Sequence, residues 1–163
     1  MTDDEFIAKQ IGDAIIARES RKWRNIVFTL DDYVGPHKNS PDWNQERQNN
    51  AIMLIDACTK LQKALENIGI HFPINHKTGT TISGEVYGGF RPQSCPIGAP
   101  DSAHKEGLAV DRYDPNGQID QYLLREIDLL TECGIYIEAP SYTPGWSHWS
   151  IRAPGSGHHI FIP

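Results

Sequence analysis

The sequence predicts a single α+β domain in which a small, largely antiparallel sheet is backed by α-helices. Two stretches repeat apolar residues at helical spacing, at residues 45–68 and about 119–132. Short apolar runs bounded by glycine, proline and other turn residues, which are typical of strands, lie at 80–84, 135–138 and 146–151. No repeat, low-complexity tract or linker divides the chain, so we expect helices and strands to share one core.

Length and composition are those of an ordinary globular protein. The chain has 163 residues, of which 39% are hydrophobic and 22% are charged, and such a chain can bury a core without disulfides. We expect one domain over 1–163, with a helical part at about 1–70 and the functional site at about 80–163. The formal net charge of -6 offers no basic surface to nucleic acid or to an anionic membrane, so neither is an expected partner. The oligomeric state stays open.

Cysteine usage and the start of the chain narrow the function classes further. Cys58, Cys95 and Cys133 include no CxxC pair and are odd in number, so we expect reduced thiols and no thiolate metal site. The N-terminus is acidic where a signal peptide is basic, and no apolar run approaches the roughly 18 residues of a membrane span. We therefore expect synthesis in the cytoplasm, no signal peptide and no membrane span.

The expected helices follow from apolar spacing and from their stop signals. Residues 3–24 are amphipathic, with acidic residues first and basic residues last, which suits the helix dipole. Residues 45–68 form the clearest helix, because no proline interrupts them and Gly69 follows as a stop. A further helix at about 119–132 ends before Gly134. The apolar stripe expected for the 45–68 helix consists of Ile52, Ile55, Leu61, Leu65 and Ile68.

The segments between the helices predict loops and short strands. Residues 31–44 include the turn formers Gly35, Pro36, Asn39, Ser40, Pro41 and Asp42, which predicts a surface loop. The strand at 80–84 leads into a run crowded with glycine and proline that extends to about residue 100, and loops held by a scaffold often carry functional groups. The end of the chain is expected to form an edge strand.

One imidazole and one carboxylate lie seven residues apart in the segment 102–111. His104 and Asp111 are separated by Gly107, which gives the backbone the freedom to fold back, and His148 is the expected third ligand. Three nitrogen and oxygen ligands with an open fourth position are the composition of a catalytic zinc site. The segment therefore indicates a zinc hydrolase, although such a ligand set also admits other divalent ions.

Two tryptophans flank the third expected ligand. Trp146 and Trp149 lie on either side of His148 in a segment expected to be a strand. We expect both indoles to pack in the core, on the face opposite the histidine.

The pattern around the expected ligands resembles that of the M15 peptidases, a group of D-alanyl-D-alanine carboxypeptidases and phage endolysins, including L-Ala-D-Glu peptidases, related to the hedgehog N-terminal domain. The family pattern Ser-x-His-x-x-Gly-x-Ala-x-Asp is matched at every fixed position over 102–111, and Trp146-Ser147-His148 matches its Trp-x-His element. Upstream, Gly88-Gly89-Phe90-Arg91-Pro92 is similar to the family's Ser-Gly-Tyr-Arg-Ser/Pro element, with glycine in place of the serine. The resemblance covers about 80–148, and more loosely most of the chain from residue 45.

The resemblance implies a hedgehog/DD-peptidase fold with zinc held by His104, Asp111 and His148. It also implies that Arg91 contacts the substrate carbonyl or a nearby carboxylate. The implied substrate is the stem peptide of peptidoglycan, cut by a carboxypeptidase or an endopeptidase at an amide bond next to a D-amino acid. A phage-type lysis enzyme, or a virion-associated wall hydrolase, would act on the cell wall after release from the cytoplasm.

One departure from the family concerns the general base. Many members carry a catalytic Glu or Asp three residues before the last metal histidine, and here that position is Gly145. The base must then come from elsewhere. Glu138, at the end of an expected strand that leads toward the His148 strand, is the first candidate, and Asp101, three residues before His104, is the second. With neither at the metal, the chain would be a noncatalytic zinc-containing binding module or a phage structural component.

Overall fold

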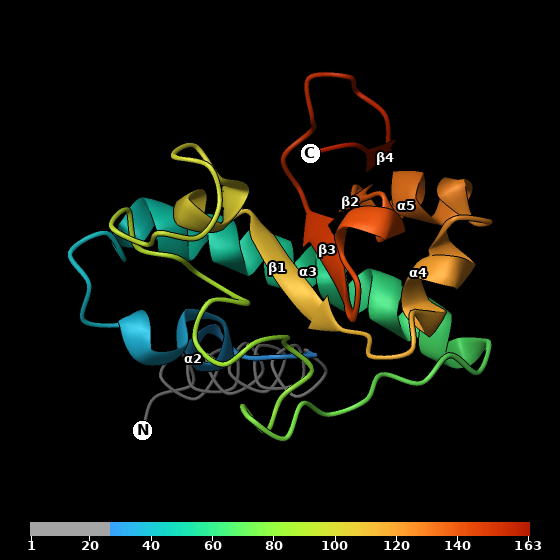
Figure 1. The fold of residues 1–163 in the computed structure, drawn as a ribbon, viewed down its shortest axis with the longest axis horizontal. Coiled ribbons are helices and arrows are strands. Elements are labelled where there is room, and N and C mark those ends of the chain that lie inside the picture. The colour runs from blue at the N-terminus through green and yellow to red at the C-terminus, as the bar shows by residue number, and fades with distance from the viewer. Residues whose placement is uncertain (1–26) are drawn as a thin grey trace, which may run out of the picture.

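The computed structural model describes residues 27–163, which contain helices and one four-stranded mixed sheet (Figure 1). The strands are β1 (Ala109–Tyr113), β2 (Tyr136–Glu138), β3 (Trp146–Ser150) and β4 (Ile160–Phe161), in the order β1-β3-β2-β4. The β1/β3 and β2/β3 pairs are antiparallel and the β2/β4 pair is parallel. The α+β class, the two expected strands after residue 135 and the terminal edge strand are confirmed.

The helix that backs the sheet is α3 (Gln45–Asn67). Its first turn is capped by Asn44, whose side chain accepts a hydrogen bond from the Arg47 backbone at 3.1 Å. Figure 1 shows α3 passing behind the strands. The prediction of this helix is confirmed, but two members of its expected stripe, Ile52 and Ile68, are 38% and 53% exposed. The apolar residues that α3 buries are Ala51, Leu54, Ile55, Cys58, Leu61 and Leu65.

The core lies between α3 and one face of the sheet. Val110 and Trp149 are opposite each other on β1 and β3, and Ile137 on β2 is opposite Trp149. All three are fully buried in the same cluster as the α3 side chains. Because side chains alternate along a strand, the residues that follow or precede these three point to the other face of the sheet.

The single helix expected at 119–132 is wrong, because two helices occupy this stretch. The first, α4 (Gln118–Leu123), begins where the Asp114 side chain accepts hydrogen bonds from the backbones of Ile119 and Asp120, at 3.2 and 3.1 Å. The second, α5 (Ile127–Cys133), ends at Gly134, which has φ +67°. Neither glycine nor proline marks the break, and the apolar spacing continues across it, so the periodicity of the sequence is that of one helix.

The surface loop expected at 31–44 is wrong in its first part, which contains α2 (Leu30–Val34) and the 3-10 turn η1 (Gly35–His37). A reciprocal cap begins α2: the Thr29 backbone donates to the Asp32 carboxylate at 2.8 Å, and the Asp32 backbone donates to the Thr29 hydroxyl at 3.0 Å. The helix buries Tyr33, whose hydroxyl donates to the carbonyl of Ala109 at 2.9 Å. This contact ties α2 to the start of β1.

One other expected element, the strand at 80–84, is not found as such. Residues 80–84 make only isolated bridges, between Asn75 and Thr80 and between Ile82 and Arg112. The helix expected at 3–24 lies outside the described residues. Within residues 27–163, no helix is both long and apolar enough to cross a membrane.

The fully buried Arg112 connects β1 to α3. The guanidinium of Arg112 lies 5.0, 5.3 and 4.8 Å from the ring centres of Phe28, Phe72 and Trp149. One nitrogen, Nη2, donates to Gln62 and Thr81, while Nε and Nη1 have no hydrogen-bond partner among the described residues. Burial lowers the pKa of Arg112 to about 10, which leaves the group charged at neutral pH.

Two substitutions of Arg112 are expected to distinguish the contribution of its packing to the free energy of unfolding from the contribution of its charge. Arg112→Ala should lower the free energy of unfolding by about 3–5 kcal/mol, because it leaves a cavity among three aromatic rings. Arg112→Met keeps most of the volume and removes a poorly compensated charge, so it should cost no more than about 1–2 kcal/mol. Urea denaturation of the metal-free proteins at pH 7 measures both values. Equal losses in the two variants would contradict the packing role.

Candidate metal centre

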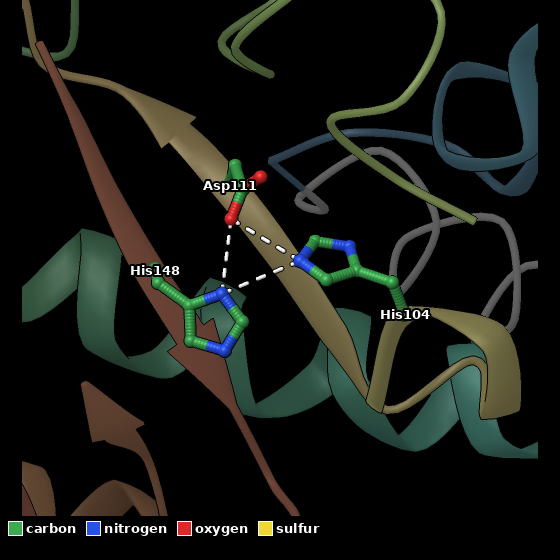
Figure 2. Close-up of side chains that lie close together, drawn as sticks. All are labelled: His104, Asp111 and His148. Carbon is green, nitrogen blue, oxygen red and sulfur yellow. Dashed lines mark hydrogen bonds and ion pairs between the residues drawn. The ribbon is translucent and has the colours of Figure 1, made fainter. Parts of the chain in front are cut away.

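The three expected ligands converge from two adjacent strands and a short turn. Asp111 on β1 and His148 on β3 are directly opposite each other in the antiparallel ladder. His104 lies on the 3-10 turn η2 (Ala103–Glu106). Figure 2 shows the three side chains pointing toward one another. All three are buried, and together they form a group that could hold a metal ion.

The spacing of the three ligand atoms fits a tetrahedral ion. The Oδ1 atom of Asp111 lies 3.2 Å from His104 Nε2 and 3.0 Å from His148 Nδ1, and the two nitrogens are 3.3 Å apart. Two ligands at about 2.0–2.1 Å from one ion, at tetrahedral angles, lie about 3.3 Å from each other. The side chains therefore need little movement to coordinate zinc or an ion of similar size.

A backbone carbonyl orients His104. Its Nδ1 lies 2.7 Å from the carbonyl oxygen of Gly89. A carbonyl only accepts, so Nδ1 carries the proton and Nε2 turns its lone pair toward Asp111 and His148. Burial lowers the pKa of His104, and the neighbouring Asp111 carboxylate opposes this shift without reversing it. Burial therefore favours the neutral form of the histidine, which is the form that binds a metal.

Gly89 must be glycine for this carbonyl to be in place. A Cβ atom on Gly89 would lie 2.0 Å from the carbonyl oxygen of Tyr33 in α2. The close contact is reinforced by Phe90, whose backbone donates to the same oxygen at 2.9 Å. Gly89 therefore serves close packing of the backbone against α2, whereas a Cβ atom on Gly88 would lie 1.9 Å from the carbonyl oxygen of Ser83.

The ionised carboxylate of Asp111 faces the two histidines with one oxygen and Arg91 with the other. Burial by itself would raise its pKa, but the adjacent imidazoles of His104 and His148 outweigh burial, so its pKa lies well below that of an ordinary carboxyl group. While Oδ1 faces the histidines, Oδ2 accepts a hydrogen bond from Arg91 Nη2 at 2.8 Å. Asp111 therefore links the metal ligands to the arginine.

Arg91 is held with part of its guanidinium directed away from Asp111. Its Nε donates to the carbonyl of Tyr87 at 2.8 Å and its Nη2 to Asp111. The third nitrogen, Nη1, lies beside Gly98, where an added Cβ would be 3.0 Å from it. Arg91 thus contacts a nearby carboxylate, that of Asp111, which is one of the two contacts that the family resemblance implies for it.

A cavity of about 450 Å³ opens on the ligand face of the sheet. All four strands contribute to its wall, because Asp111 on β1 is opposite His148 on β3, and Glu138 on β2 is paired with Phe161 on β4. Continuing the β2/β3 register by one residue places Glu138 opposite His148. The other wall residues include Arg91, Ile97, Asp101, Ser102, Trp146, Ser150, Arg152 and Pro154.

The two candidates for the general base occupy different positions. Oε1 of Glu138 lies 4.0 Å from His148 Nε2, and the side chain is 22% exposed. Burial raises the pKa of Glu138, with the nearby His148 acting in the opposite direction. Asp101 lies at the exposed edge of the cavity, where its carbonyl oxygen accepts a hydrogen bond from Arg152. The structure thus brings Glu138 closer to the ligands than Asp101.

Gly145, at the position where the family pattern has an acid, has φ +88°. Only glycine adopts this backbone conformation without strain. An acidic side chain at this position would require a different turn into β3. The departure from the family pattern is therefore built into the backbone that leads to His148.

The expectation that both tryptophans lie in the core is wrong for Trp146. Trp149 is fully buried in the core, as expected. Trp146 is half-buried and lines the cavity. Side chains two residues apart on a strand share a face, so Trp146 lies on the same side as His148. The signal was present in the spacing of the two residues.

Sequence reasoning missed two further contributors to the site. The Gly89 carbonyl is a backbone group and carries no side-chain signal, although the adjacent glycines marked an unusual backbone. The contact of Arg152 with residues 101–106 has no signal in the sequence, because it joins segments about 50 residues apart.

Comparisons with protein families, with curated proteins and with solved structures found no match. The chemistry of the site therefore rests on its own geometry. That geometry is a buried His-Asp-His group able to hold a metal ion, beside a cavity that also contains an arginine and a second carboxylate.

Proposed function

We propose that this protein is a zinc-dependent peptidase of the M15 type that hydrolyses an amide bond in the stem peptides of peptidoglycan, next to a D-amino acid, as a phage-type wall lysis enzyme. The observation that carries the proposal is the triangle of Asp111 Oδ1, His104 Nε2 and His148 Nδ1, with sides of 3.0–3.3 Å, at the wall of a cavity. The motif resemblance, which covers most of the chain from residue 45, supports the hedgehog/DD-peptidase fold in a single domain.

The chain's own residues supply the other parts of a hydrolytic site. Zinc held by His104, Asp111 and His148 would supply a Lewis acid that can lower the pKa of water toward about 7. Glu138 is the proposed group that accepts a proton from water and delivers it to the leaving amine. Arg91, fixed by Asp111 and Tyr87, uses Nη1 to donate to the carbonyl oxygen as negative charge develops on it.

Incubation of the zinc-loaded protein with purified peptidoglycan tests this function. The expected products are new amino termini or free D-alanine, identified by mass spectrometry of the soluble fraction. Protein treated with a chelator serves as the control and should release neither. The identity of the fragments would also distinguish a carboxypeptidase from an endopeptidase.

The second candidate function is a noncatalytic zinc-containing binding module or phage structural component. Gly145, at the position of the family's acid, favours it. The position of Glu138 favours it too, because its Oε1 lies 4.0 Å from Nε2 of His148, and Nε2 is not the ligand atom. Protein that binds one equivalent of zinc and sediments with peptidoglycan, but releases no product, would establish this alternative.

Trp146 is expected to contribute to substrate affinity. Trp146→Ala removes a half-buried indole from the cavity wall, so the affinity for a stem peptide should fall by about 5- to 30-fold, equivalent to about 1–2 kcal/mol of contact. Isothermal titration of the zinc-loaded protein with the peptide measures this change. Tyr142→Ala is the matched control, because Tyr142 is 50% exposed and does not line the cavity. Unchanged affinity in the Trp146 variant would remove the indole from the binding surface.

A further inference from the structure

The three ligands of the candidate metal centre do not share one support. The β1/β3 ladder fixes Asp111 and His148 relative to each other. His104 lies on η2, a turn of four residues outside the sheet. The distance from His104 to the other two ligands therefore depends on the contacts that hold η2 against the strands.

Two side chains from α3 hold the back of η2. Asn50 donates to the carbonyl of Glu106 at 2.8 Å, and Arg47 Nε donates to the carbonyl of Lys105 at 3.2 Å. These contacts join the turn to the helix behind the sheet. They do not connect it to the strand that carries His148.

Arg152, two residues beyond the end of β3, makes that connection. Its Nη1 donates to the carbonyl oxygen of Asp101 at 2.7 Å and to the Glu106 carboxylate at 2.9 Å. These two acceptors lie on either side of His104 in the sequence. One guanidinium nitrogen therefore holds both ends of the segment that presents the histidine.

The backbone leading from β3 to Arg152 is itself fixed. Ile151 donates to the carbonyl of Leu108 at 3.0 Å, and the Ser150 hydroxyl donates to the same oxygen at 3.2 Å. The Arg152 backbone in turn donates to the Ser150 hydroxyl at 3.0 Å. The guanidinium thus starts from a backbone whose position is set by the strand that carries His148.

We propose that Arg152 is a positioning residue that sets His104 at coordination distance from Asp111 and His148, and so raises the affinity of the site for its metal. The inference rests on the metal site of the proposed function, not on hydrolysis. The side chains of Arg152 and Glu106 are 39% and 45% exposed, and ion pairs this exposed contribute little to global stability. The effect of Arg152 is therefore local to η2.

Zinc affinity, measured by competition with a chromophoric chelator, tests the inference without substrate. Arg152→Ala should bind zinc about 10- to 100-fold more weakly than the wild type, the usual effect of losing a group that orients a ligand. Arg152→Lys, which can still donate to the carboxylate, should recover part of this loss. Arg125→Ala is the matched control, because Arg125 is exposed and lies outside the cavity, and it should match the wild type within about twofold.

Two further measurements separate positioning from general destabilisation. The visible absorption of the cobalt-substituted protein, which reports ligand number and geometry, should change in Arg152→Ala and stay unchanged in Arg125→Ala. The melting temperature of metal-free Arg152→Ala should lie within about 2 °C of the wild type, as expected for an exposed ion pair.

Wild-type zinc affinity and cobalt spectrum in Arg152→Ala would overturn the inference, as would a large fall in the melting temperature of the metal-free variant. Failure of the proposed hydrolysis would give a different set of results. The wild type would bind zinc and the Arg152 variant would bind it more weakly, but neither protein would release product from peptidoglycan. A wild type that binds no zinc would overturn both.

Discussion

Replacement of His104 by alanine is expected to weaken zinc binding by about 100- to 1,000-fold. Zinc sites with four protein ligands have apparent binding free energies of about 10–16 kcal/mol, so one ligand accounts for about 2.5–4 kcal/mol. Loss of the imidazole also leaves the Gly89 carbonyl without its hydrogen bond. Equilibrium competition with a chelator, followed by metal analysis of the protein after gel filtration, measures the change.

His76→Ala is the control for this substitution, because His76 is exposed and does not belong to the ligand group. It should retain wild-type affinity. Circular dichroism of both metal-free variants establishes that each one folds. Wild-type zinc affinity in a folded His104→Ala protein would refute the ligand assignment.

Glu138→Gln is expected to lower turnover of peptidoglycan by about 100- to 10,000-fold, the usual contribution of a general acid–base group. The amide has nearly the shape of the carboxylate but cannot accept the proton. Since Glu138 lies 4.0 Å from the outer nitrogen of His148, outside the ligand triangle, zinc affinity should change by less than about threefold. Product release under saturating zinc, with affinity measured in parallel, tests both statements.

Asp101→Asn is the matched comparison, because Asp101 also lines the cavity but lies at its exposed edge. It should retain turnover within about twofold of the wild type. The reverse pattern, with full activity in the Glu138 variant and loss in the Asp101 variant, would move the role of the base to Asp101. Full activity in both variants would exclude these two carboxylates.

The parts of the fold that the sequence predicts well are those where local signals are sufficient. The helix α3 has an uninterrupted apolar repeat, a polar cap at Asn44 and Gly69 beyond its end. The convergence of His104, Asp111 and His148 follows from a compact motif and one strand segment downstream, and the structure brings the three together.

The parts that the sequence does not predict depend on tertiary contacts. The break between α4 and α5 preserves the apolar spacing, so no local pattern reveals it. From the sequence alone, Arg112 would be placed at the surface. In the structure, Phe28, Phe72 and Trp149 surround its guanidinium. The α2 cap is different, since Thr29 and Asp32 are spaced as a capping box and could have been identified from the sequence.

The neighbouring charges on β1 oppose a shift of this strand by one residue against β3. Asp111 points toward the histidines on one face, and Arg112 points into the aromatic cluster on the other. A shift of β1 by one residue against β3 would exchange the two faces. The carboxylate would then be buried among Phe28, Phe72 and Trp149, and the guanidinium would enter the ligand triangle in its place. Burial of the carboxylate among aromatic rings and placement of the guanidinium between the histidines would both cost free energy. Asp111 and Arg112 therefore also favour the correct pairing of β1 with β3 during folding.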